Sequence, residues 1–66
     1  MRIHLNGEPR EISQPLTISE LLESAGYTQR RVAVEVNRDI VPKSRHSAHH
    51  LQDGDRVEIV QAIGGG

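Results

Sequence analysis

The chain has 66 residues, a formal net charge of −1 at pH 7, no Cys, Phe or Trp, and one Tyr. A chain of this length forms one small domain, which buries only about 60% of the surface that its unfolded chain exposes. Without Cys it has neither disulfides nor a Cys-based zinc site, so its core must consist of Ile, Leu and Val, which favour sheet.

The near-zero charge, without a basic block, argues against nucleic acid as a partner. No apolar run approaches the length of a membrane helix, and the N-terminus lacks the apolar region of a signal peptide. We therefore expect a cytoplasmic protein that contacts no membrane.

A β-hairpin is predicted at the start of the chain. Residues 2–6 alternate polar and apolar side chains, which is the period of a half-buried strand. Asn6-Gly7 is a strong signal for a tight hairpin turn, and residues 8–13 return as the second strand. Pro9 has no backbone donor, so this second strand belongs at an edge of the sheet or close to the turn.

A short helix follows the hairpin. Thr17 is a good N-cap, and Glu20 three residues later completes a capping box. Leu16 and Leu21 occupy the positions of a hydrophobic staple, and Gly26 suits the left-handed residue that ends a helix. One helical face is apolar and consists of Ile18, Leu21, Leu22 and Ala25. So short a helix needs a sheet to pack against.

The second half of the chain predicts three more strands. Residues 31–37 form the clearest one, with Val at 32, 34 and 36 on one face. A polar turn at 37–39 leads to a short strand at 40–41, which Pro42 ends. Residues 43–50 are polar and irregular, with room for one helical turn, and Leu51 is expected to reach the core. A turn at 53–55 precedes the last strand, from Arg56.

This order of elements predicts an α+β fold with one helix packed across one face of a mixed sheet of four to five strands. The first and last strands would lie parallel at the centre, with the first hairpin on one flank and the third strand on the other. That arrangement is the β-grasp, or ubiquitin-like, fold. A ferredoxin-like half is the alternative, which the missing second helix disfavours. Residues 1–62 would form the domain and residues 63–66 a tail.

The whole chain resembles the thiamine-biosynthesis sulfur carriers of the ThiS family. The resemblance is carried by residues 34–43 (VEVNRDIVPK), the Asp-Gly-Asp turn at 53–55, and Gly65-Gly66 at the end. Gly64 departs slightly, because the family more often has Ala or another small residue there. A Gly run alone fits a frayed terminus equally well, so the combination of features supports the family.

The resemblance implies a carrier protein rather than an enzyme. The Gly66 carboxylate would be adenylated and then converted to a thiocarboxylate, which donates sulfur to the thiazole moiety of thiamine. The implied partners are an E1-like adenylyltransferase that uses ATP and magnesium, a cysteine desulfurase or rhodanese-type sulfur donor, and a thiazole synthase. The chain itself would bind no cofactor and would be a monomer when free.

The residues expected to contact these partners precede Gly66. In the last strand Val57 and Ile59 point to the helix-covered face, so the opposite face presents Val60 and Ala62 near Ala33. The partner-binding set is predicted to comprise Val60, Ala62, Ile63, Gly64 and Gly65.

Other interpretations remain open on sequence grounds. The small subunit of a molybdopterin synthase also ends in Gly-Gly on this fold, and a ubiquitin-like modifier or a plain binding module would share it. His46, His49 and His50 could ligate a metal, but no carboxylate or Cys lies at regular spacing nearby, so a solvated loop is the preferred interpretation. Asp53-Gly54-Asp55 lacks the further ligands of a calcium loop. No Ser has the His and acid partners of a nucleophile.

Overall fold

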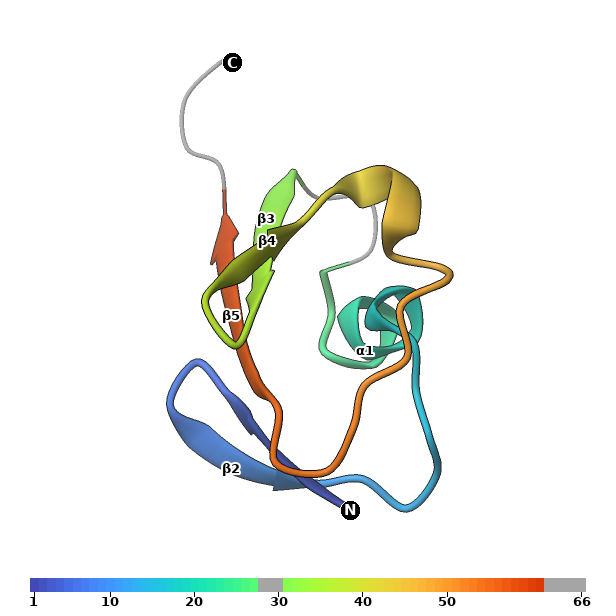
Figure 1. Cartoon of the computed structure of the whole chain (residues 1–66), viewed down its shortest axis with the longest axis vertical. Helices are drawn as coiled ribbons and strands as arrows, with labels where there is room; N and C mark the ends of the chain where they lie inside the picture. Colours follow the sequence, from blue (N-terminus) through green and yellow to red (C-terminus); the bar gives the residue numbers. More distant parts are fainter. Residues whose placement is uncertain (28–30, 62–66) are drawn as a thin grey trace.

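The computed structural model describes residues 1–27 and 31–61, which form a mixed five-stranded sheet with one α-helix (Figure 1). The elements in chain order are β1 (Arg2–Leu5), β2 (Glu8–Glu11), α1 (Ile18–Ser24), β3 (Val32–Val36), β4 (Asp39–Val41), the 3₁₀ helix η1 (Lys43–Arg45) and β5 (Arg56–Gln61). No helix in the described ranges is long and apolar enough to cross a membrane.

The strand order is β2-β1-β5-β3-β4, with β1 and β5 parallel and the other neighbouring pairs antiparallel. Figure 1 shows α1 on one side of this sheet. This arrangement is the predicted β-grasp, and the predicted α+β class is confirmed. The second strand is shorter than predicted, because β2 ends at Glu11 and not at Ser13. The next residue, Ile12, is buried in the core, and its N–H donates to Met1 O at 2.8 Å.

Both hairpins turn through two residues with positive φ. Asn6 and Gly7 have φ of 51° and 84°, and Asn37 and Arg38 have φ of 52° and 73°. Two positive values in a two-residue loop define a type I′ turn, whose twist matches that of the flanking strands. Gly7 adopts this conformation without steric cost, whereas Arg38 has a Cβ that crowds the backbone there.

The predicted capping box opens α1. Thr17 Oγ1 accepts a hydrogen bond from Glu20 N at 3.2 Å, and Glu20 Oε1 accepts one from Thr17 N at 2.8 Å. The bond from the Thr17 backbone N–H to the ionised carboxylate, and after it the bond from the Thr17 hydroxyl, lower the pKa of Glu20 below its ordinary value. The stabilisation from this lowered pKa is therefore present above the usual glutamate pKa and is lost as the pH falls through the lowered one.

The connection after β4 supplies hydrogen-bond acceptors to the first N–H groups of α1. Ile18 N and Ser19 N, which have no partner within the helix, donate to the carbonyls of His49 and His46 at 3.0 Å each. At the other end Gly26 has φ of 86°, and Tyr27 N donates to Leu22 O at 2.8 Å, which is the closing bond of a Schellman motif. A helix of seven residues thus has partners at both ends.

The core lies between α1 and the covered face of the sheet. Val34, Val57 and Ile3 are fully buried on the sheet side, and Leu51 reaches the same core from the connection before β5, as predicted. The buried apolar residues are Ile3, Ile12, Ile18, Leu21, Leu22, Val34, Val36, Val41, Leu51, Val57 and Ile59. All are aliphatic, in agreement with the composition.

Replacing Arg38 with Gly should stabilise the fold. The change removes the Cβ that crowds the left-handed backbone, and it makes the second turn an Asn-Gly turn like the first. After subtracting the greater freedom of Gly in the unfolded chain, we expect a gain of about 0.5–1 kcal/mol. Urea unfolding measures it as a higher midpoint at unchanged slope.

Gly7→Ala is the matched control, since it introduces a Cβ at the corresponding position of the first turn, and it should lower the midpoint. A lower midpoint for Arg38→Gly would show that the Arg38 side chain makes contacts worth more than the backbone strain.

Candidate functional site

The side chains of β5 point to the two faces of the sheet as predicted. Val57 and Ile59 are buried against the helix side, whereas Val60 is 60% exposed on the other face. Val60 lies directly opposite Ala33 of β3, which is also exposed. The expected neighbours therefore meet on the open face, close to the point where β5 ends at Gln61.

Ile40 on β4 adds to this surface and was missed by the sequence analysis. Its side chain is 72% exposed, and it lies opposite Glu35 of β3 on the same open face as Ala33 and Val60. The signal was present in the alternation, because Val41 faces the core opposite Val34 and its neighbour must point the other way. We refer to Ala33, Ile40 and Val60 as the open-face patch.

Ala62, Ile63, Gly64, Gly65 and Gly66 lie outside the described residues. Their predicted roles in partner binding and, for Gly66, in covalent modification therefore stay predictions. The boundary between domain and tail also stays a prediction.

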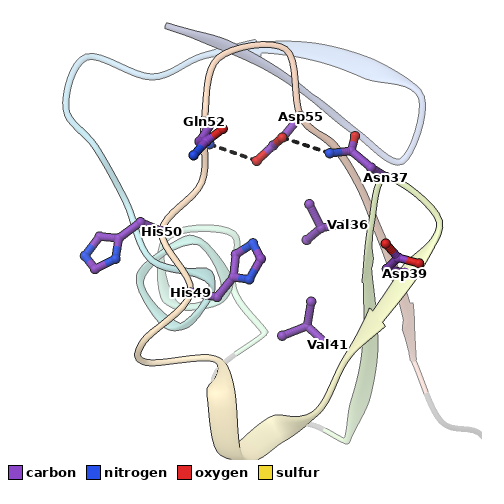
Figure 2. Close-up of a pocket in the computed structure, with 8 residues that line it drawn as sticks. All are labelled: Val36, Asn37, Asp39, Val41, His49, His50, Gln52 and Asp55. Atoms are coloured by element: carbon purple, nitrogen blue, oxygen red, sulfur yellow. Dashed lines mark hydrogen bonds between the residues drawn. The ribbon is translucent and has the colours of Figure 1, made fainter.

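The residues that suggested the family have a structural role. Asn37 Nδ2 donates to Asp55 Oδ1 at 3.0 Å, and Asn37 Oδ1 accepts from Arg56 N at 3.0 Å. Asn37 N also donates to Arg56 O at 2.8 Å, so this residue continues the pairing of β3 with β5 by one position. Asp55 is buried, and its other oxygen accepts from Gln52 N at 2.8 Å. Figure 2 shows this chain of hydrogen bonds. We call it the Asn37–Asp55 clamp.

A hollow of about 290 Å³ lies beside the clamp, between the β3–β4 hairpin and the connection to β5. Its wall combines the apolar side chains of Val36 and Val41 with polar groups, and His49 points into it while His50 points away (Figure 2). The hollow lies where β5 begins, at the opposite end of that strand from Gln61.

One interpretation of the His cluster is wrong for His46. This side chain is only 5% exposed, and its Nε2 lies 2.9 Å from Val41 O, to which it donates. It is thus a buried link between β4 and the connection, and not part of a solvated loop. Within residues 1–27 and 31–61, no three His, Cys, Asp or Glu side chains come together as metal ligands.

Comparison with known proteins decides the family. The ThiS family model matches residues 3–66. The chain belongs to the ThiS family. The sulfur carrier protein ThiS of Escherichia coli K12 is 35% identical over 66 residues, which cover all of both chains. The crystal structure of the thiamine biosynthesis protein ThiS from Geobacter metallireducens matches with a TM-score of 0.86 and 32% identity, again over all of both chains.

A longer protein also contains this domain. A thiazole synthase of Paramagnetospirillum magneticum is 47% identical over 66 residues, which are all of this chain and 20% of that protein. The chain therefore spans a fifth of the length of this relative. A ThiS-like region and a protein named thiazole synthase thus occur in one polypeptide.

The Asn37–Asp55 clamp should be needed for stability. Asn37→Ala removes the side-chain donor to the buried Asp55 Oδ1 and the acceptor for the exposed Arg56 N, so a buried carboxylate oxygen loses a partner. Such losses cost roughly 1–3 kcal/mol, so thermal or urea unfolding should show a clear fall in stability.

Asp39→Ala is the control for the clamp, because Asp39 is exposed in the same hairpin. We expect its effect to stay within about 0.5 kcal/mol. Equal losses for the two variants would mean that the clamp does not hold the hairpin to β5.

Proposed function

We propose that this chain is a sulfur carrier of thiamine biosynthesis, whose Gly66 carboxylate is adenylated and then converted to a thiocarboxylate. The observation that supports this most is the match over the whole chain, in sequence and fold, to proteins named ThiS, together with three glycines at residues 64–66.

The chemistry requires activation because a carboxylate is a poor acyl donor. A carboxylate oxygen of Gly66 attacks the α-phosphorus of ATP, and pyrophosphate leaves. The resulting acyl-adenylate has AMP as a good leaving group. The terminal sulfur of a persulfide on the donor then attacks the carbonyl carbon and displaces AMP, which gives an acyl disulfide. A thiol attacks the donor's sulfur and breaks the S–S bond, so that –COS⁻ leaves and the donor and the thiol are joined as a disulfide. An α-carboxyl group is ionised at neutral pH, which suits the first step.

Glycine suits the reacting end because it has no Cβ. A partner can enclose the carboxylate in a narrow site beside a nucleotide and a metal ion, and the residue can adopt any φ there. In this proposal the chain has no catalytic residue and no cofactor of its own. It is a co-substrate, and the magnesium and ATP belong to the partner's reaction.

Three kinds of partner follow from this chemistry. An E1-like adenylyltransferase activates the terminus, a cysteine desulfurase or rhodanese-type protein supplies sulfur, and a thiazole synthase consumes it. The thiazole synthase has direct support, because a relative of that name contains a region similar to this chain. The carrier would pass between these enzymes in the cytoplasm as a free monomer.

The decisive experiment measures intact mass. After incubation with the adenylyltransferase, ATP, magnesium and a sulfur source, the mass of the chain should rise by the difference between sulfur and oxygen. An unchanged mass with partner enzymes of proven activity would refute the carrier function.

Deleting Gly66, or adding one residue after it, serves as control. Both variants should keep the melting temperature and lose at least tenfold in conversion rate, since the reacting geometry tolerates little displacement.

The open-face patch should dock on the partners. Val60 is exposed next to the end of β5, where a partner that takes Gly66 must approach. Val60→Asp places a charge in that contact and should weaken binding to both the adenylyltransferase and the thiazole synthase by about tenfold or more. Its melting temperature should stay near that of the wild type because the side chain is not in the core. A folded variant that binds both enzymes normally would remove Val60 from the interface.

A further inference from the structure

The open face of the sheet carries an arrangement of charge that the fold does not need. Glu35 of β3 and Glu58 of β5 are direct partners in the antiparallel register. Like charges directly opposite each other on one face of a sheet are destabilising. In the described part of the chain, the one ion pair joins Arg2 to Glu11, so neither Glu35 nor Glu58 forms an ion pair there, although Arg56 lies two residues before Glu58 on the same face.

The two glutamates lie beside the residues of the open-face patch. Ile40, Glu35 and Glu58 form one row across β4, β3 and β5. The next row, toward the end of β5, contains the Ala33–Val60 pair. Ile40 and Val60 are the large exposed hydrophobic residues of the described structure, and they flank the two carboxylates. Two opposed carboxylates with apolar side chains on either side form a surface suited to a cation carried on an apolar partner surface.

We propose that this surface binds the thiazole synthase through one arginine of the enzyme, placed between Glu35 and Glu58, with apolar enzyme side chains over Ile40 and Val60. This inference rests on the proposed carrier function. Arginine fits better than lysine because its planar guanidinium has five donors and can serve two carboxylates at once. Arginine is also enriched at interfaces, where lysine is depleted.

The thiazole synthase is the occupant because this domain and that enzyme occur in one polypeptide in a relative. The patch is also continuous with the end of β5, so an enzyme that takes the C-terminal residues passes over it. Complementary charge and proximity to the reacting end thus point to the same partner.

The arrangement has a consequence that a purely structural role would not share. Removing one of the opposed charges relieves repulsion in the free carrier, so its stability should rise or stay unchanged. The same change removes half of the site for the enzyme's cation, so affinity should fall. Stability and affinity are expected to move in opposite directions, whereas damage to the fold would lower both.

The test compares Glu35→Gln and Glu58→Gln with Glu23→Gln, an equal change of charge at an exposed position of α1, away from the open face. Binding to purified thiazole synthase is measured by calorimetry at low and high salt, and each variant is melted. We expect Glu35→Gln and Glu58→Gln to bind about tenfold more weakly at low salt, with a smaller salt dependence and an equal or higher melting temperature. Glu23→Gln should bind like the wild type.

A charge reversal makes the test sharper. Glu35→Lys places an ammonium opposite Glu58, which should raise the melting temperature through a cross-strand ion pair and abolish detectable binding. Wild-type affinity for Glu35→Gln and Glu58→Gln, a loss no greater than that of Glu23→Gln, or a loss accompanied by a lower melting temperature would each overturn the proposal. So would a wild-type chain that becomes thiocarboxylated but does not bind thiazole synthase.

The same preparations separate this inference from the proposed function. Conversion of the wild-type chain to a thiocarboxylate is followed by mass in parallel. If the wild type is not converted by active partner enzymes, the carrier function fails. If it is converted and the glutamate variants bind normally, only the docking inference fails.

Discussion

The position of β5 at the centre of the sheet is the constraint on which the rest of the structure depends. It is hydrogen-bonded on one side to β1 in parallel and on the other to β3 in antiparallel. Residues far away in the sequence hold this strand and the turn before it: Asn6 Oδ1 accepts from Ile59 N at 2.7 Å, and Asp53 Oδ1, in the turn before β5, accepts from Arg2 N at 2.7 Å. β1 pairs with Arg56 and Val57 at the start of β5, and β3 pairs with β5 from Val57 to Gln61, so the strand is held from both sides at its start and from the β3 side at its end.

The central position of β5 also gives its two faces different roles. Val57 and Ile59 are buried toward α1 and contribute to stability, while Glu58 and Val60 lie on the face turned away from α1. The Asn37–Asp55 clamp fixes where β5 begins, and the proposed chemistry takes place beyond where it ends. The residues by which the family can be recognised at 34–43 and 53–55 thus hold the scaffold.

Features that depend on residues close together in the sequence could be predicted, whereas features that depend on distant residues could not. The capping box of Thr17 and Glu20 and the Asn6-Gly7 turn are specified by residues at most three apart, and both were predicted correctly. The buried position of His46 was not, because it depends on the backbone carbonyl of Val41 and on contacts that a polar stretch of sequence does not reveal.

The register between β3 and β5 explains why the Glu35–Glu58 pair and the Asn37–Asp55 clamp could not be predicted from the sequence. Alternation shows which side chains of a strand share a face, but not which residue of the neighbouring strand lies opposite. Glu35 and Glu58 are 23 positions apart, and a shift of two residues would keep every apolar side chain on its face while separating the two carboxylates. The clamp between Asn37 and Asp55 depends on the same register.

In the proposed function the carrier visits several enzymes, so it must bind each of them and then leave, which favours a small interface on a rigid body. The open-face patch meets this requirement, since it has only two large apolar side chains, and the core that stabilises the fold lies entirely on the other face. Affinity can therefore be adjusted on the open face without disturbing the core. Where the carrier region and a thiazole synthase share one polypeptide, the linkage raises the effective concentration of one for the other, so a weaker contact suffices. A separate carrier has no such linkage. Its surface has to supply the whole affinity itself, and the proposed charged contact, which would form rapidly and weaken with salt, would provide it without trapping the carrier on one enzyme.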